Sequence, residues 1–302
     1  MKILGLNKMR GIIITNQDVG HNAYKIRRFT EEGNKLGISL THIINDGSLA
    51  VIKNNNIVLK LPEADFIIYL DKDIYLARIL ERYGYRLFNK ADFIKMCDDK
   101  MLTNIMCSNL GIKMPKTIAG PLFYSPILKE ENLKFLSDVA SELGFPLIVK
   151  KVYGSLGTGV YLVKNMQELT SLYTELCRQP LQFQEYISSS FGKSLRVLVI
   201  NGKILGAFQR YNTEDFRSNF GSTAKSREFI LTDKFIDIVN KIIKSFDVEY
   251  AGIDLLFGEN DEPVLCEINS NAFFEEFEKT TKINVAEAFM KMVKRKMENE
   301  QK

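Results

Sequence analysis

The chain has 302 residues, of which 45% are hydrophobic and 26% charged, and its formal net charge is +4. This length suits two or three subdomains, and the composition is typical of a globular, soluble protein. The basic residues are dispersed, so an anionic small molecule explains the charge balance as well as a nucleic acid does, and no direct nucleic-acid partner is expected.

Targeting and redox signals favour the cytoplasm. Lys8 and Arg10 interrupt the apolar residues of the N-terminus, which does not read as a signal peptide, and no apolar run approaches the length of a membrane span. The four cysteines show no C-x-x-C spacing, which indicates free thiols in a reducing compartment. Only His21 and His42 are present, far in sequence from the motifs below, so a zinc site or a histidine-based triad is not expected.

Strand and helix patterns alternate along the first 96 residues. Strands are predicted over 11–15, 40–44, 66–70 and 86–88, helices over 22–36 and 74–83, and a hairpin over 49–60 that turns at 54–56. This alternation predicts an α/β subdomain with a largely parallel sheet over residues 1–96.

The pattern changes near Lys90. Helices are predicted over 91–110, 132–143, 166–178 and 235–246 and after Asn284, and strands over 146–153, 160–163, 181–186, 195–200 and 203–210. Two further apolar runs flank the polar turn at 258–263 and are predicted strands.

Three oxygen donors belong to the last two predicted strands. Asp254 lies within one strand, and Glu267 and Asn269 close the other on one face, because side chains alternate along a strand. If the strands pair, the three side chains can converge as ligands for Mg²⁺, which also takes phosphate oxygens and water. The alternative is that they are ordinary polar residues at strand ends.

A glycine-rich segment, G-S-L-G-T-G, joins two predicted strands. Its members Gly154, Ser155, Gly157 and Gly159 allow close approach of the backbone to a ligand, and successive N–H groups can cradle phosphate. No G-K-[ST] follows, so this is not a Walker loop, and a plain glycine hairpin is the alternative.

Lysines and arginines supply positive charge near these motifs. Lys150 and Lys151 precede the glycine segment on adjacent strand positions, so one can face a cleft while the other faces solvent. Arg196, Arg210 and Arg217 lie on or just after later strands, where they could stabilise a transferring phosphate or simply be solvated.

The segment Gln184, Glu185, Tyr186 and Ile187 ends an apolar strand. Its backbone groups could pair with the edge of an adenine, or the strand could simply run out into a loop.

These segments, in this order, resemble the landmarks of the ATP-grasp ligases, and among them the RimK-type α-L-glutamate ligase-like group. Between Cys97 and Val285 they read C-D-D-K-M-L-T-N-I-M, G-I-K-M-P-K-T, P-L-I-V-K-K-V-Y-G-S-L-G-T-G-V, Q-E-Y-I, D-F-R-S-N, A-G-I-D-L-L, E-I-N-S and E-K-T-T. The resemblance implies an ATP-grasp fold, in which an N-terminal parallel α/β subdomain (1–96) precedes two α+β lobes (97–183 and 184–302) that sandwich the nucleotide.

The resemblance also implies roles for individual residues. ATP phosphates would contact Lys100 and Lys150, the glycine segment would be a mobile flap, and residues 184–187 would form the adenine hinge. The phosphate end of the site would hold Arg217 and Asn219, and Arg210 would bind the acyl phosphate or the acceptor. Two Mg²⁺ ions, with Mn²⁺ as a substitute, would bind Asp254, Glu267 and Asn269, with Glu267 bridging them.

Two departures from the family pattern concern specificity. Ser194 stands where the family often places an acid just before the arginine that corresponds to Arg196. After E-I-N-S the family usually continues with a Pro-Gly pair, whereas this chain continues Asn271-Ala272-Phe273-Phe274. That loop faces the acceptor in relatives, so an atypical amine is expected.

The implied reaction is ATP-dependent amide or peptide bond formation through an acyl phosphate. It would add glutamate or another amino acid to a peptide, protein or small molecule, and relatives are often dimers or tetramers. A peptide-modifying macrocyclase is a second hypothesis. A nucleotide-binding regulator without catalysis is a third, which the intact set of candidate ligands disfavours.

Overall fold

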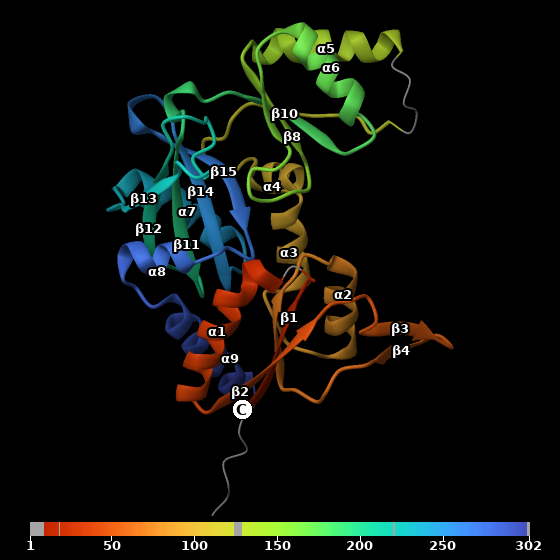
Figure 1. Ribbon diagram of the computed structural model, residues 1–302, viewed down its shortest axis with the longest axis vertical. Helices are drawn as coiled ribbons and strands as arrows, with labels where there is room; N and C mark the ends of the chain where they lie inside the picture. The colour runs from red at the N-terminus through yellow and green to blue at the C-terminus, as the bar shows by residue number, and fades with distance from the viewer. Residues whose placement is uncertain (1–8, 18, 124–128, 220, 301–302) are drawn as a thin grey trace, which may run out of the picture.

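The computed structural model describes residues 9–17, 19–123, 129–219 and 221–300. Its strands form a four-stranded parallel sheet, a four-stranded antiparallel sheet, a five-stranded antiparallel sheet and a separate hairpin. Figure 1 shows the parallel sheet at the bottom of the view, the five-stranded sheet at the left and the four-stranded antiparallel sheet at the top. The expected mixed α/β architecture is confirmed.

The parallel sheet has the strand order β2-β1-β5-β6. Its elements are β1 (Met9–Thr15), β2 (Ile38–Ile44), β5 (Phe66–Leu70), β6 (Leu87–Phe88), α1 (Val19–Lys35) and α2 (Ile74–Tyr83), and the hairpin is β3 (Ala50–Lys53) with β4 (Asn56–Leu59). β5 is buried along its whole length, as a strand covered on both faces must be. Ile68 faces one hydrophobic core and Ile67 the other, because neighbouring side chains point to opposite faces.

The second sheet has the order β7-β10-β8-β9 and is covered by two helices. Its elements are β7 (Thr117–Ala119), α5 (Glu130–Leu143), β8 (Leu147–Lys151), β9 (Val160–Val163), α6 (Met166–Leu176) and β10 (Leu181–Glu185). Leu136 of α5 and Leu169 of α6 pack against Val149 and Phe183 of the sheet. The two helices at the top of Figure 1 therefore cover its outer face.

The third sheet has the order β13-β12-β11-β14-β15 and carries helices on both faces. Its elements are β11 (Lys193–Ile200), β12 (Lys203–Tyr211), β13 (Lys225–Glu228), α7 (Asp233–Ser245), β14 (Tyr250–Phe257), β15 (Pro263–Asn269), α8 (Glu275–Thr281) and α9 (Val285–Glu300), with short 3-10 turns at Ser188–Ser190 and Glu259–Asp261. Phe289 of α9 shares one core with Leu198 of β11, Ile68 of β5 and Phe29 of α1. The first and third sheets are therefore held together by a common hydrophobic core.

One predicted helix is wrong in its extent. The segment 91–110 forms two helices, α3 (Ala91–Asp98) and α4 (Lys100–Cys107). Asp99 between them has an extended backbone, and its side chain accepts a hydrogen bond from the Leu102 backbone N–H at 2.8 Å. This N-cap starts the second helix and explains the break.

Three short elements, β7, β13 and α8, lie where no strand or helix was predicted. Each has between three and seven residues, which is too short for a clear periodic pattern. Within the described ranges, no helix is both long and apolar enough to cross a lipid bilayer.

Candidate active site

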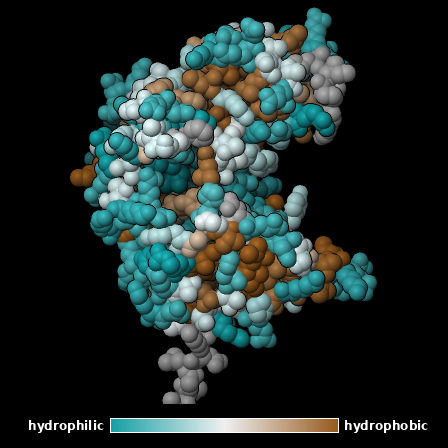
Figure 2. Space-filling view, in the orientation of Figure 1, coloured by the Kyte–Doolittle hydropathy of each residue, from teal (hydrophilic) through white to brown (hydrophobic). Residues whose placement is uncertain are grey.

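A cleft of about 410 Å³ opens between the three sheets. Its walls come from the glycine segment, the end of β10, the face of β11, β12, β14 and β15, and the ends of β1 and β5. Figure 2 shows the molecule hollowed on the side where these elements meet, with hydrophilic surface inside. With the exception of Gly159 at the base of the glycine loop, the residues to which the sequence assigns a site role all line this cleft. They are Lys100, Lys150, Gly154, Ser155, Gly157, Gln184, Glu185, Tyr186, Ile187, Arg210, Arg217, Asn219, Asp254, Glu267 and Asn269.

The three candidate metal ligands are brought together by strand pairing. Asp254 of β14 pairs with Glu267 of β15, and Gly252 pairs with Asn269. The register shifts after Asp254, so that Leu255 pairs with Leu265 and Cys266 is the extra residue of a β-bulge. The bulge lets both Cys266 and Glu267 face the cleft, although neighbours in a regular strand would point to opposite sides.

Asp254 is held by two arginines. Its Oδ1 accepts from Arg196 Nε at 2.6 Å, and its Oδ2 accepts from Arg196 Nη2 at 2.5 Å and lies 2.8 Å from Arg210 Nη2. All three side chains are buried. Burial raises the pKa of the Asp254 carboxyl, but the attraction of Arg196 and Arg210 outweighs it and holds that pKa well below its usual range. Asp254 is therefore ionised, and both of its oxygens already have partners.

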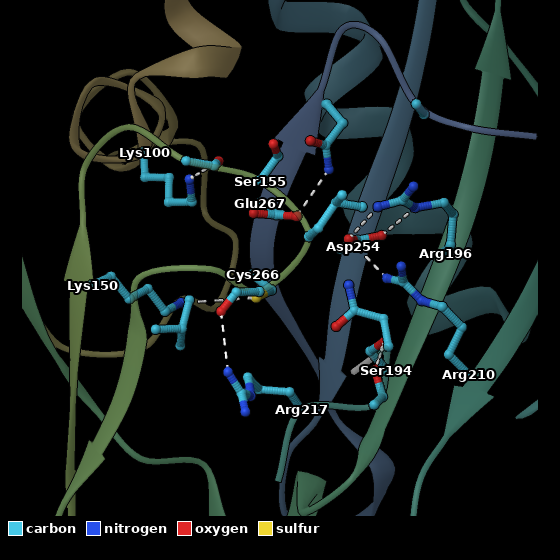
Figure 3. Close-up of a pocket in the computed structure, with 18 of the residues that line it drawn as sticks. Lys100, Lys150, Ser155, Ser194, Arg196, Arg210, Arg217, Asp254, Cys266 and Glu267 are labelled. Atoms are coloured by element: carbon cyan, nitrogen blue, oxygen red, sulfur yellow. Dashed lines mark hydrogen bonds and ion pairs between the residues drawn. The ribbon is translucent and has the colours of Figure 1, made fainter. Parts of the chain in front are cut away.

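The hydrogen bonds and ion pairs of the three candidate ligands determine how well each of them could bind a cation. Glu267 and Asn269 are partly exposed to the cleft, and Asn269 Nδ2 donates to Glu267 Oε1 at 3.0 Å. A carboxylate and an amide oxygen facing a polar cleft suit Mg²⁺. Asp254 fits less directly, because a metal at its oxygens would have to share them with Arg196 and Arg210. Figure 3 shows Glu267 and Asp254 in the middle of the cleft, with the two arginines beyond them.

Two lysines reach the cleft from the opposite wall. Lys100 Nζ donates to the Gly154 carbonyl at 2.7 Å, and burial lowers the pKa of Lys100 while the charge of Glu267 opposes that shift. Lys150 Nζ lies 4.0 Å from Cys266 Sγ. Lys150 lines the cleft, whereas the stem of Lys151 lies against Gly159, so adjacent strand positions diverge as expected. Figure 3 shows both cations, Lys100 and Lys150, facing Glu267 and Cys266.

The glycine segment is a tight loop that a nearby arginine contacts. Gly157 and Gly159 have φ angles of 72° and 78°, which L side chains rarely adopt. The Thr158 N–H donates to the Ser155 carbonyl at 3.0 Å and closes the turn. Arg217, which is paired with Asp215, also donates through Nη1 to the Gly157 carbonyl at 3.3 Å. The loop is thus connected to the wall that carries the arginines.

The predicted hinge lies at the end of β10. Glu185 is the last residue of the strand, and its backbone N–H donates to the Lys116 carbonyl at 2.9 Å. Gln184 Nε2 donates to Thr117 Oγ1 at 2.8 Å. Beyond the strand, Tyr186 and Ile187 line the cleft without belonging to the sheet, and the Ile187 carbonyl accepts from the Ser190 N–H at 3.0 Å.

Ser194 has its own partner in place of a charged neighbour. Its hydroxyl lies 2.6 Å from that of Ser218, and both are buried. Pairing places Ser194 opposite Arg210 across β11 and β12. Ser194 therefore lies beside Arg210 as a neutral residue whose hydroxyl is paired with Ser218.

Sequence reasoning gave residues 1–96 a part in the substrate cleft only through the family resemblance, and it named no residue of the first sheet there. Asn16 follows β1 and Lys72 follows β5, and both line the cleft together with His21 and Asn22 of α1. Lys72 Nζ forms an ion pair with Asp98 at 2.5 Å. The order β2-β1-β5-β6 reverses direction between β1 and β5, and ligands bind at such switch points beside the carboxyl ends of strands. That rule could have identified these positions once the strand order was known.

Comparisons with known proteins identify a family whose model covers most of the residues that line the cleft. A family model described as the RimK-like ATP-grasp domain matches residues 97–293. An uncharacterized protein of Mycoplasma genitalium is 35% identical over 210 residues, which are 68% of this chain and 72% of that protein. The ribosomal protein bS6–L-glutamate ligase of Escherichia fergusonii is 28% identical, over 72% of this chain and 70% of its own length.

Solved structures show the same fold. The D-alanine–D-alanine ligase of Bacillus anthracis, solved with ATP, superposes with a TM-score of 0.72 at 17% identity and covers 96% of this chain and 98% of its own.

Proposed function

The chain belongs to the RimK-like ATP-grasp family of acid–amine ligases, and from this premise we propose that it activates a carboxylate with ATP and joins it to an amine through an acyl phosphate. The proposed substrates are glutamate or a related amino acid and a peptide, protein or small-molecule partner. The observation that carries the proposal is that Lys100, Lys150, Arg210 and Glu267 line the same cleft.

The division into units is part of this proposal. Residues 1–96 would shape the substrate end, residues 97–183 would supply the flap over the phosphates, and residues 184–302 would supply the hinge and the metal ligands. ATP would lie with its adenine at residues 184–187 and its phosphates between the glycine loop and β15.

In the first step a carboxylate oxygen attacks the γ-phosphorus of ATP, and ADP leaves. Lys100 and Lys150 would bind phosphate oxygens, and Arg217 and Asn219 would orient the terminal phosphate. Mg²⁺ held by Glu267 and Asn269, with Asp254 beside them, would neutralise charge on the phosphates. Pre-positioned charges of this kind stabilise the transition state without a nucleophilic side chain.

In the second step an amine attacks the acyl carbon, phosphate leaves with the oxygen it acquired, and the amine loses a proton. Arg210 is placed to stabilise the anion, because its guanidinium lines the cleft and its buried Nε has no hydrogen-bond partner among the described residues. Asp254 would hold the guanidiniums of Arg196 and Arg210 in place for this task.

The test is substrate-dependent ADP formation with purified protein, ATP, Mg²⁺ and a panel of amino acids and peptides, with products identified by mass spectrometry. Glu267→Gln should keep the fold and lower the rate about 10²–10³-fold. Glu262→Gln is the matched control, because Glu262 is an exposed acid just before the same strand, paired with Lys234. Equal activity in Glu267→Gln and wild type would refute the metal assignment.

A further inference from the structure

The loop that follows the candidate metal strand is fixed by side chains. Three successive carbonyls of this loop each accept a hydrogen bond: Ser270 from Asn89 Nδ2 at 2.8 Å, Asn271 from Lys25 Nζ at 3.3 Å, and Ala272 from the Tyr250 hydroxyl at 2.7 Å. Two of the three donors belong to the first 96 residues. These hydrogen bonds therefore position the loop mainly relative to residues 1–96.

Asn271 is the point where three elements meet. Its Nδ2 donates to the Leu70 carbonyl at the end of β5 at 2.8 Å, and its Oδ1 accepts from Lys25 Nζ of α1. It lies two residues after Asn269 at the end of β15. One side chain thus links the parallel sheet, the first helix and the strand with the candidate ligands.

Lys25 is an unusual residue for this position. Its side chain is 1% exposed, its hydrogen-bonding partners are two neutral amide oxygens of Asn271, and its Nζ lies 4.6 Å from the centre of the Phe273 ring. Burial lowers the pKa of Lys25 to about 7. A buried ammonium with neutral partners costs stability. Filling space alone would be better achieved by Met or Leu, so packing does not explain a lysine here.

Phe273 stands between two cavities. The Phe273 ring and His21 line both the cleft and a second cavity, whose other walls include Tyr24, Lys25 and Arg27 of α1. The centres of the Phe273 and His21 rings are 6.0 Å apart. Phe273 therefore forms part of the partition between the cleft and the second cavity, beside the start of α1.

We propose that Lys25 and Asn271 are positioning residues that hold Phe273 as a fixed wall of the acceptor subsite, and that Phe273 limits the size of the amine that can reach the acyl phosphate. This inference rests on the proposed ligase function. The ammonium of Lys25 binds the loop by its carbonyl, its amide and its aromatic ring at once. An apolar side chain such as Met could donate neither hydrogen bond and would lose the contact of a cation with the ring.

Lys25→Met tests the positioning role. The Michaelis constant for the amine should rise about tenfold, which corresponds to the loss of one hydrogen bond from the loop, while that for ATP should change less than about twofold. The matched control is Lys35→Met, an exposed lysine at the end of the same helix, paired with Glu32, and it should leave both constants unchanged. Hydrogen exchange of residues 268–276 should accelerate in Lys25→Met and not in Lys35→Met.

Phe273→Ala tests the size limit. Its kcat/KM for bulky amines, relative to small ones, should rise about tenfold or more, and Phe273→Leu should give a smaller change. If wild type is active and neither Lys25→Met nor Phe273→Ala alters the amine preference or its Michaelis constant, the inference is wrong. An equally large loss of ATP affinity in Lys25→Met would also overturn the inference, because the substitution would then impair the whole site and not the amine subsite alone. Failure of the ligase proposal itself would appear differently, as wild type that forms no ADP with any substrate.

Discussion

At the scale of single residues, charged side chains in the wall of the cleft form buried ion pairs with one another. Asp254 forms ion pairs with two buried arginines, Arg196 and Arg210, and their attraction keeps its carboxylate ionised. The sequence indicates that Asp254 can lie beside Glu267 and Asn269 if the two predicted strands pair, because side chains alternate along a strand. It does not predict the two arginine partners, because they come from β11 and β12, whose pairing depends on the whole sheet.

Asp254→Asn should destabilise the fold. The substitution leaves Arg196 and Arg210 buried without a counter-charge, and breaking a buried ion pair in this way costs about 3–5 kcal/mol. Urea unfolding followed by circular dichroism measures the change. Asp237→Asn serves as the comparison, because its ion pair with Lys241 is exposed and contributes at most about 1 kcal/mol. Similar unfolding midpoints for the two variants would show that the Asp254 network is not structural.

At the scale of elements, the predicted strands and helices mostly agree with the observed ones where patterns are long. The prediction of α2 matches the observed Ile74–Tyr83, and β5 matches Phe66–Leu70. The missed β13 reads K-S-R-E and pairs only with β12 at the edge of its sheet, so it has no apolar face to reveal it. The break at Asp99 was missed because apolar spacing continues across it, whereas the cap depends on one side chain.

The glycine loop should tolerate an added methyl group poorly. Gly159→Ala must adopt a φ angle near 78° and places its Cβ 2.9 Å from the Lys151 side chain, so the flap should shift and kcat/KM for ATP should fall about tenfold. Steady-state kinetics with varied ATP measure this. Gly47→Ala carries the same kind of backbone strain, with φ at 86° and open space around its Cβ. It should lower stability slightly and leave the ATP kinetics intact, and equal kinetic effects in both variants would argue against a flap.

At the scale of the whole molecule, the cleft joins segments that are distant in sequence. The motifs between Lys100 and Asn269 indicated from sequence which residues line the candidate nucleotide and metal half of the cleft, because their residue types carry recognisable chemistry. The other half was not predictable. Asn22 and Lys72 reach the cleft only because the parallel sheet packs through α1 and α9 onto the third sheet, and Lys25 meets Asn271 across 246 positions of sequence.

The central claim is that a carboxylate accepts the γ-phosphoryl group of ATP before the amine attacks. Once an active substrate pair is found, the most direct measurement uses a substrate whose reacting carboxylate carries ¹⁸O at both oxygens, followed by mass spectrometry of the released phosphate. The account predicts one ¹⁸O atom in each phosphate formed with amide product. Unlabelled phosphate, or label found in AMP, would contradict it.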